Sequence, residues 1–214
     1  MANSDLAARI IRRAGPAAVR VDPELAAALG AYLELLGRWN KKINLTGLAV
    51  DPPNDEAIDR LIIEPLAAAR HLRAKDRLVL DVGSGGGSPA VPMKLGVPAL
   101  DFVLIEAKVR KAAFLREAIR QLGLAGVQVE NCRVEDLGFR QDLRGQADVV
   151  TLRAVCMDAR LLASAAAFLK PGGRVFAFVT NELARNMSLP NTESVGLVPA
   201  LESRLLILKP DRLQ

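Results

Sequence analysis

The spacing of apolar residues changes near residue 76, and this change divides the chain into two parts. Over residues 25–36, apolar side chains recur every three or four positions, as they do on the buried face of a helix. The preceding Asp-Pro-Glu at residues 22–24 predicts the start of this helix, because it supplies a capping acceptor, a proline suited to the first turn and an acid facing the helix dipole. A second helical stretch is expected to be interrupted at Pro65. Residues 1–75 are therefore predicted to form an N-terminal helical extension packed on the core.

From residue 76 onward, short apolar runs alternate with helical stretches. This alternation predicts an α/β fold over residues 76–214, with a doubly wound, parallel sheet covered by helices on both faces. One helix is expected to end at Gly123, and a later helix to stop at the turn over residues 171–173. The predicted strands cover residues 78–82, 101–106, 127–131, 147–152, 174–179 and 203–209, and the predicted helices of this part cover residues 111–122 and 161–169.

Composition narrows the class of protein further. Aromatic residues make up only 4% of the chain, so the core must be built from aliphatic side chains, which suits buried parallel strands. No apolar run is long enough to span a membrane, charges interrupt residues 1–15, and the two cysteines lack the spacing of a disulfide or metal site. We therefore expect a cytoplasmic protein, a monomer without a bound metal. The net charge of +5 is compatible with a polyanionic partner but too small to require one.

The strongest candidate site is the glycine-rich turn at residues 83–87, Gly-Ser-Gly-Gly-Gly, which follows the first predicted strand. Glycines let the backbone approach a ligand closely, although such a turn also serves as a plain strand-to-helix connection. Glu106 ends the second predicted strand and should lie beside this turn, where a carboxylate can accept both hydroxyls of a ribose. The alternative interpretation of Glu106 is an ordinary strand-end acid paired with Lys108 or Arg110. Together, the turn and the acid predict a cofactor that contains a nucleoside.

The residues around the turn indicate which nucleoside cofactor is bound. A nicotinamide dinucleotide site has a third glycine where this chain has Ser88, and Asp81 adds negative charge where a pyrophosphate would lie. An acid at this place suits a cationic ligand such as the sulfonium amino acid of S-adenosylmethionine. Residues 168–175 also resemble the turn that leads into the fifth strand of class I methyltransferases. An S-adenosylmethionine-dependent methyltransferase is therefore favoured over a nicotinamide-dependent oxidoreductase.

Motifs along the whole chain resemble those of one family, the bacterial guanine-N7 methyltransferases of small-subunit (16S) ribosomal RNA, also called glucose-inhibited division protein B. The resemblance implies a class I methyltransferase fold, with the cofactor placed against Gly83, Gly85, Ser88, Glu106, Val134, Glu135 and Arg153. The similar motifs are Leu35-Leu36-Gly37-Arg38-Trp39-Asn40, Ile43-Asn44-Leu45-Thr46, Asp81-Val82-Gly83-Ser84-Gly85, Glu106 with Arg110-Lys111, Arg133-Val134-Glu135, Arg153-Ala154-Val155 and Arg204-Leu205-Leu206-Ile207-Leu208-Lys209.

The chain departs from the family pattern at three places, one of them in the helix before the first strand, which is expected to help shape the target pocket. Leu61, Glu64 and Pro65 stand where the family has a His and then Asp-Ser, Ser88-Pro89-Ala90 replaces Phe-Pro-Gly, and the second-strand acid is Glu106 instead of Asp. The departures at residues 61–65 leave open a methyltransferase for a small molecule or a protein. A cofactor-binding module without activity, acting as an RNA-binding or assembly protein, is a further alternative.

The resemblance also implies a simple mechanism, because guanine N7 has a free lone pair and no proton to lose. We therefore expect no catalytic general base, and we interpret His71 as a surface residue. Arg153 is expected to support the target side, or else to pair with Asp148 or Asp158. Trp39 is expected to fill the core, with stacking on a base as the alternative. A basic rim for the phosphates of ribosomal RNA or the small ribosomal subunit is expected from Arg38, Lys41, Lys42, Lys108, Arg110 and Lys111.

Overall fold

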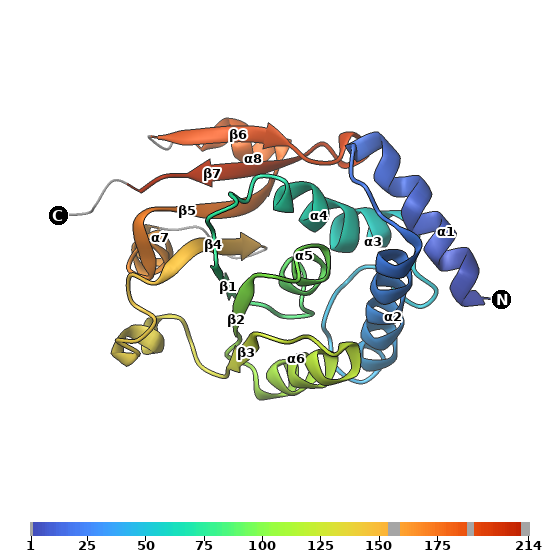
Figure 1. The fold of residues 1–214 in the computed structure, drawn as a ribbon, viewed down its shortest axis with the longest axis horizontal. Coiled ribbons are helices and arrows are strands. Elements are labelled where there is room, and N and C mark those ends of the chain that lie inside the picture. The colour runs from blue at the N-terminus through green and yellow to red at the C-terminus, as the bar shows by residue number, and fades with distance from the viewer. Residues whose placement is uncertain (1, 154–158, 188–190, 211–214) are drawn as a thin grey trace.

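The computed structural model describes residues 2–153, 159–187 and 191–210 and contains one seven-stranded sheet (Figure 1). The strand order is β3-β2-β1-β4-β5-β7-β6, in which the first five strands run parallel and β7 and β6 are antiparallel to their neighbours. The strands are β1 Leu78–Val82, β2 Asp101–Ile105, β3 Val127–Glu130, β4 Ala147–Arg153, β5 Leu169–Thr180, β6 Thr192–Gly196 and β7 Ser203–Leu208.

Alternate residues of each strand face opposite layers of the molecule. Val79 belongs to a core shared with helices of the N-terminal half, whereas its neighbour Leu80 packs on the other side with Phe168. In Figure 1, α1 to α6 lie on one side of the sheet and α7 on the other. The helices are α1 Ala2–Ala14, α2 Pro23–Asn40, α3 Asp55–Ile58, α4 Glu64–Ala69, α5 Ala90–Gly96, α6 Val109–Leu122, α7 Ala159–Ala166 and α8 Asn181–Asn186, with a π-helical segment at Asp59–Ile63 and short 3-10 turns at Gly15–Ala17, Glu135–Phe139 and Pro199–Leu201.

The α/β, Rossmann-like fold class and the predicted strands are confirmed, and so are two predicted helix ends. Asp22 caps α2 by accepting a hydrogen bond from the backbone N–H of Leu25 at 2.8 Å. Gly123 ends α6 in the left-handed conformation with φ 63°. The expectation of a fully parallel sheet is wrong at the edge formed by β7 and β6. The short, mostly polar β6 has no strict apolar alternation, so it could not be predicted from the residue pattern.

Two local predictions are also wrong, because in each case a proline lies within a regular element at a position that tolerates it. Pro65 does not interrupt the helical stretch, because it lies in the first turn of α4 directly after the π-helical segment, where a missing N–H costs little. The expected turn at residues 171–173 lies within β5. The register shifts there, since Leu169 pairs with Ala147 and Arg174 pairs with Val149. The extra residues therefore form a bulge in the strand.

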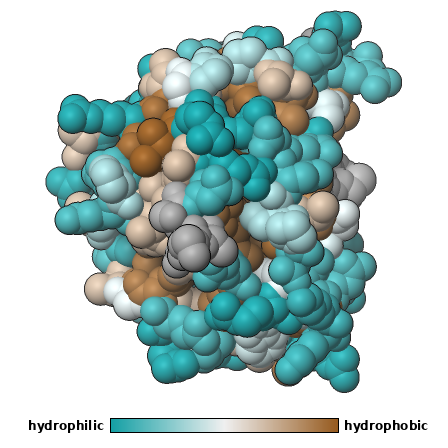
Figure 2. All heavy atoms as spheres, turned by 90° about the vertical axis from the view of Figure 1, so that its right-hand side faces the viewer, coloured by the Kyte–Doolittle hydropathy of each residue, from teal (hydrophilic) through white to brown (hydrophobic). Residues whose placement is uncertain are grey.

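Figure 2 shows the face that lies on the right in Figure 1, where hydrophilic side chains predominate and hydrophobic ones gather in separate areas between them. Within the described ranges, no helix is long and apolar enough to span a membrane.

Candidate active site

The glycine turn lies at the carboxyl end of β1, at the edge of the sheet where a doubly wound fold binds its ligands. The backbone N–H groups of Gly83 and Ser84 both donate to the carbonyl of Ile105, at 2.9 and 3.1 Å. Glu106 follows β2 and holds the turn from the side: Oε2 accepts from the N–H of Gly85 at 2.9 Å, and Oε1 accepts from the N–H of Lys108 at 2.7 Å. The predicted proximity of the acid and the turn is therefore confirmed. The pairing of Glu106 with the charged groups of Lys108 or Arg110 is not found, because the Lys108 backbone is the donor.

The glycines of the turn serve different purposes. A Cβ atom added to Gly87 would come within 2.9 Å of Val91 and 3.5 Å of Tyr32, so this glycine allows close packing of helices beneath the turn. A Cβ atom added to Gly85 would meet only the Gly83 carbonyl at 3.6 Å and the Lys111 ammonium at 4.0 Å. Gly85 has φ 51° and borders an open cleft, which is the geometry expected where a ligand approaches the backbone.

Two hollows meet at the turn and share Gly83. We call the one next to α2 the inner cleft and the one next to the ends of β2 and β3 the outer cleft. Among the residues expected to hold the cofactor, Gly85, Ser88 and Arg153 line the inner cleft, and Val134 and Glu135 line the outer cleft. The inner cleft is lined by Leu36, Leu45, Thr46, Leu48, Arg60, Leu61, Gly83, Ser84, Gly85, Gly86, Ser88, Lys111 and Arg153, and the outer cleft by Val82, Gly83, Ile105, Ala107, Cys132, Arg133, Val134, Glu135, Arg160 and Leu161.

The N-terminal signature forms one wall of the inner cleft. Asn40, the last residue of α2, accepts hydrogen bonds at Oδ1 from the N–H groups of Leu45 and Thr46 and donates from Nδ2 to the Thr46 carbonyl, at 2.8 to 3.0 Å. These bonds fold the segment after α2 back toward the glycine turn. Tyr32 reaches the turn from below, and its buried hydroxyl donates to the Gly86 carbonyl at 2.6 Å. The signature is therefore part of the site, although it lies far from the turn in sequence.

Asp81 is buried beneath the turn and is 1% exposed. Its Oδ1 accepts from the Thr151 hydroxyl at 2.5 Å, while its Oδ2 has no hydrogen-bond partner. Burial raises the pKa of this carboxyl to about 6, against the hydrogen bond from Thr151, which favours the charged form. The unpaired oxygen leaves a negative charge under the turn that a cation in the cleft would stabilise.

The raised pKa of Asp81 makes the stability of the fold depend on pH. The folded state holds this proton more tightly than the unfolded chain does. Protonated Asp81 therefore contributes most to the free energy of unfolding below about pH 4, and this contribution is lost as the pH rises through about 6. Asp81→Asn removes that titration. We expect the free energy of unfolding of the variant, minus that of the wild type, to increase by about 2 kcal/mol between pH 4 and pH 7. Urea unfolding at unit pH steps measures this difference, and a constant difference across the range would contradict the prediction.

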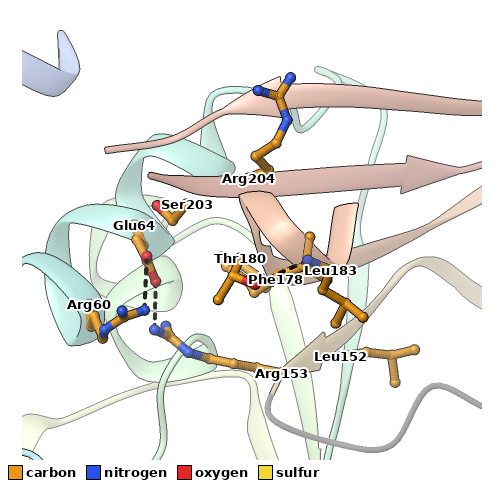
Figure 3. A pocket seen from close by; sticks show the side chains of 10 residues that line it. Arg60, Glu64, Leu152, Arg153, Phe178, Thr180, Leu183, Ser203 and Arg204 are labelled. Carbon is orange, nitrogen blue, oxygen red and sulfur yellow. Dashed lines mark hydrogen bonds and ion pairs between the residues drawn. The ribbon is translucent and has the colours of Figure 1, made fainter. Parts of the chain in front are cut away.

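A third hollow, the β4–β5 cavity, opens where these two strands end (Figure 3). It has a volume of about 240 Å³. Arg153 at the end of β4 borders both this cavity and the inner cleft, as does Arg60. The β4–β5 cavity is lined by Arg60, Glu64, Leu152, Arg153, Phe178, Val179, Thr180, Leu183, Ser203 and Arg204.

Glu64 lies between the two arginines, as the dashed lines of Figure 3 show. The side chain of Glu64 is 3% exposed, and its Oε2 accepts from Arg153 Nη2 at 2.6 Å. Its Oε1 is 3.9 Å from Arg60 Nη1 and has no hydrogen bond. The guanidinium of Arg153 also donates to the Ser88 hydroxyl at 3.1 Å and lies over the ring of Phe178, 5.5 Å from its centroid.

This arrangement corrects the expected partner of Arg153. Asp148 instead accepts from Lys170 and from the backbone at the start of β1, and Asp158 lies outside the described residues, as do Ala154 and Val155 of the same motif. Residues that depart from the family pattern surround Arg153, directly or through Ser88. Glu64 is its ion-pair partner, and the Leu61 carbonyl accepts from the hydroxyl of Ser88 at 3.0 Å.

Sequence reasoning missed three contributions to the site. Lys111 was expected only on a basic rim, but its ammonium lies next to Gly85. Arg60 was not singled out, because an arginine on a helical stretch gives no signal of its own. Tyr32 was interpreted only as part of an apolar stripe, and its position beneath the turn depends on a contact between residues 54 positions apart.

Known proteins resemble this chain in sequence and in fold. Residues 25–195 match the family described as rRNA small subunit methyltransferase G. The ribosomal RNA small subunit methyltransferase G of Polynucleobacter asymbioticus is 35% identical over 206 residues, which cover 90% of each chain. The protein of that name from Streptococcus thermophilus is 37% identical over 148 residues, which cover 68% of this chain and 61% of that protein. A solved putative transferase from Pyrococcus horikoshii shares the fold with a TM-score of 0.53 at 18% identity, covering 69% of this chain and 63% of that one.

Proposed function

Because this chain belongs to the family of rRNA small subunit methyltransferase G, we propose that it catalyses methylation of guanine N7 in small-subunit (16S) ribosomal RNA, with S-adenosylmethionine as methyl donor. The observation that carries the proposal is the position of Arg153. This residue borders both the inner cleft beside the glycine turn and the β4–β5 cavity, so a donor and an acceptor bound in these hollows would meet at one side chain. The family and the class I fold expected from the sequence are confirmed.

The residues around the glycine turn fit S-adenosylmethionine, which supplies an electrophilic methyl group when bound. The unpaired Oδ2 of Asp81 puts a negative charge beneath the turn, which suits a cationic ligand. Each carboxylate oxygen of Glu106 accepts one backbone N–H and keeps a lone pair for a ribose hydroxyl. Val134 and Glu135 would flank the base in the outer cleft, and the ammonium of Lys111 would pair with the amino-acid carboxylate.

Methylation at N7 requires alignment of the base and stabilisation of charge, and it requires no removal of a proton. N7 carries a free lone pair, so the protein has to hold the base in line with the methyl group and stabilise the positive charge that develops on the ring. Glu64 supplies a buried carboxylate beside the β4–β5 cavity. His71 is partly buried, and its backbone carbonyl accepts from Arg174 away from both clefts, so we assign it no part in the reaction.

The β4–β5 cavity would receive the target base in this proposal. Phe178 and Leu152 give it apolar walls, and Thr180 and Ser203 add hydroxyls. The guanidinium of Arg204 points away from Glu64 in Figure 3 and donates to the Oγ and the carbonyl of Ser194. Arg60, Glu64 and Arg153 therefore supply the charged groups of the cavity on the side that faces the inner cleft.

A second candidate is methylation of a small molecule or a protein, and a specific observation favours it. Leu61 and Glu64 replace the residues usual in the family and line the inner cleft and the β4–β5 cavity, respectively, so the pocket at which they meet differs from the family pattern.

The deciding experiment is methyl transfer to purified small ribosomal subunits, with naked 16S RNA and a metabolite extract in parallel. We expect label on 7-methylguanosine, identified by nucleoside mass spectrometry. His71→Ala should keep full activity, because no proton has to be removed at N7. Label on a ribose oxygen, an exocyclic amine or a pyrimidine carbon would contradict the N7 assignment, and label only in a metabolite would favour the second candidate. We expect the enzyme to act in the cytoplasm as a monomer.

A further inference from the structure

A separate hollow, the α2–α6 groove, lies outside the site described above and has a volume of about 530 Å³. One side comes from the end of α2 and the turn after it, and the other from α6. None of the residues that line it is acidic. They are Leu35, Arg38, Trp39, Lys42, Ile43, Arg110, Ala113 and Gln121.

The positive charges of the groove are not neutralised by the protein. Within the described part of the chain, Lys42 and Arg110 have neither an ion pair nor a side-chain hydrogen bond, and Arg38 has only a 3.5 Å contact with the Gln121 amide oxygen. By contrast, Arg9, Arg13 and Lys41, which also precede β1, form ion pairs with Asp55, Asp59 and Asp51. Three cations along one groove without an acid between them create a local positive potential that suits an anionic ligand.

Trp39 gives the groove an aromatic surface. Its ring meets the buried ring of Phe114 in an edge-to-face contact with centroids 5.7 Å apart, which fixes its orientation from the core side. The side chain is only partly buried and borders the groove, and no hydrogen bond within the described residues engages its indole N–H. A rigid aromatic surface among unpaired cations is the combination that binds an unstacked base together with its phosphates.

We propose that the α2–α6 groove is a second nucleotide-binding site, which holds a single-stranded RNA segment with one base against Trp39 and its phosphates on Lys42 and Arg110. The proposal rests on the proposed function and deepens it, because it adds an RNA contact apart from the reacting base. The groove adjoins the inner cleft along both helices. Leu35 lines the groove and Leu36 the cleft, while Arg110 lines the groove and Lys111 the cleft. A strand bound in the groove would therefore lie near the inner cleft, with the neighbouring basic residues Arg110 and Lys111 on the two hollows.

The only tryptophan in the chain is Trp39, so intrinsic fluorescence reports directly on the groove. We expect a single-stranded ten-nucleotide RNA to quench this fluorescence, and a duplex of the same length to quench it far less. Lys42→Glu with Arg110→Glu should weaken binding at least about tenfold and lower the slope of log K against log salt by about 1.4, the value for two phosphates on a single strand. Arg20→Glu with Lys75→Glu is the matched control, since it changes the net charge equally at two exposed residues that line neither the groove nor the clefts. It should change affinity less than about threefold.

Two further readouts separate the possible outcomes. Binding of S-adenosylmethionine, measured by calorimetry, should be unchanged in both double variants, which verifies the fold and the clefts. With labelled RNA and anisotropy detection, Trp39→Phe should retain most of the affinity, whereas Trp39→Leu should lose it. RNA binding without quenching, or an equal loss of RNA affinity in the control double variant, would contradict RNA binding in the groove even if methyl transfer to the subunit is observed. Quenching without methyl transfer would support the groove and count against the proposed function.

Discussion

Replacing Gly85 by valine is expected to abolish S-adenosylmethionine binding while the chain stays folded. A Cβ atom at Gly85 meets no backbone closer than 3.6 Å, so the added side chain would project into the inner cleft. We expect affinity to fall more than about 100-fold, which corresponds to about 3 kcal/mol. Calorimetry with S-adenosylmethionine measures the effect, and circular dichroism reports on the fold.

The substitution also introduces backbone strain, which needs its own control. Gly123 has a similar backbone conformation, with φ 63° against 51°, and nothing lies within 4 Å of an added Cβ atom. It follows α6, away from the turn. Gly123→Val should therefore carry a comparable strain and leave cofactor affinity unchanged. If Gly85→Val binds as tightly as the wild type, the turn is only a structural connection.

Replacing Glu64 by alanine is expected to lower the free energy of unfolding by about 3–5 kcal/mol and to remove most activity on the ribosomal subunit. The side chain of Arg153 is only 15% exposed, so loss of Glu64 leaves its guanidinium without an opposite charge in a poorly solvated place. Burial alone already lowers the pKa of Arg153, and Glu64 acts against that shift. Urea unfolding measures the loss of stability, and single-turnover methylation measures the loss of activity.

Two related variants distinguish a buried pair from a surface effect. Glu56→Ala removes an exposed partner of Arg60, since the Glu56 side chain is 51% exposed. It should lower the free energy of unfolding by less than about 1 kcal/mol. Glu64→Leu combined with Arg153→Leu removes both charges and should recover much of the stability without recovering activity. If Glu64→Ala were as stable as Glu56→Ala, the ion pair would contribute little to the fold.

The sequence predicted those parts of the structure that depend on neighbouring residues. The strand that ends in glycines, the cap at Asp22 and the left-handed stop at Gly123 each follow from a few adjacent positions. The proximity of Glu106 to the turn also followed, because parallel strands with crossover helices bring their carboxyl ends to one edge of the sheet. These rules hold whatever the distant contacts are.

Contacts between distant residues were predicted poorly. Arg153 was assigned acids close to it in sequence, but its partner Glu64 is 89 residues away. Trp39 was weighed as a core residue or a stacking surface, and the structure shows one ring that packs on Phe114 and also borders a groove. The sequence-based interpretation treated core packing and an exposed surface as exclusive alternatives, whereas one folded side chain can have both.

The hydrogen bond from Tyr32 to Gly86 has a consequence for the order in which the protein is made. Synthesis proceeds from the N-terminus, so α2 is complete long before the turn that its tyrosine must support. The cleft gains its last wall only when Arg153 has been added and can reach Glu64 and Ser88. A nascent chain that ends before Arg153 therefore lacks a finished binding site.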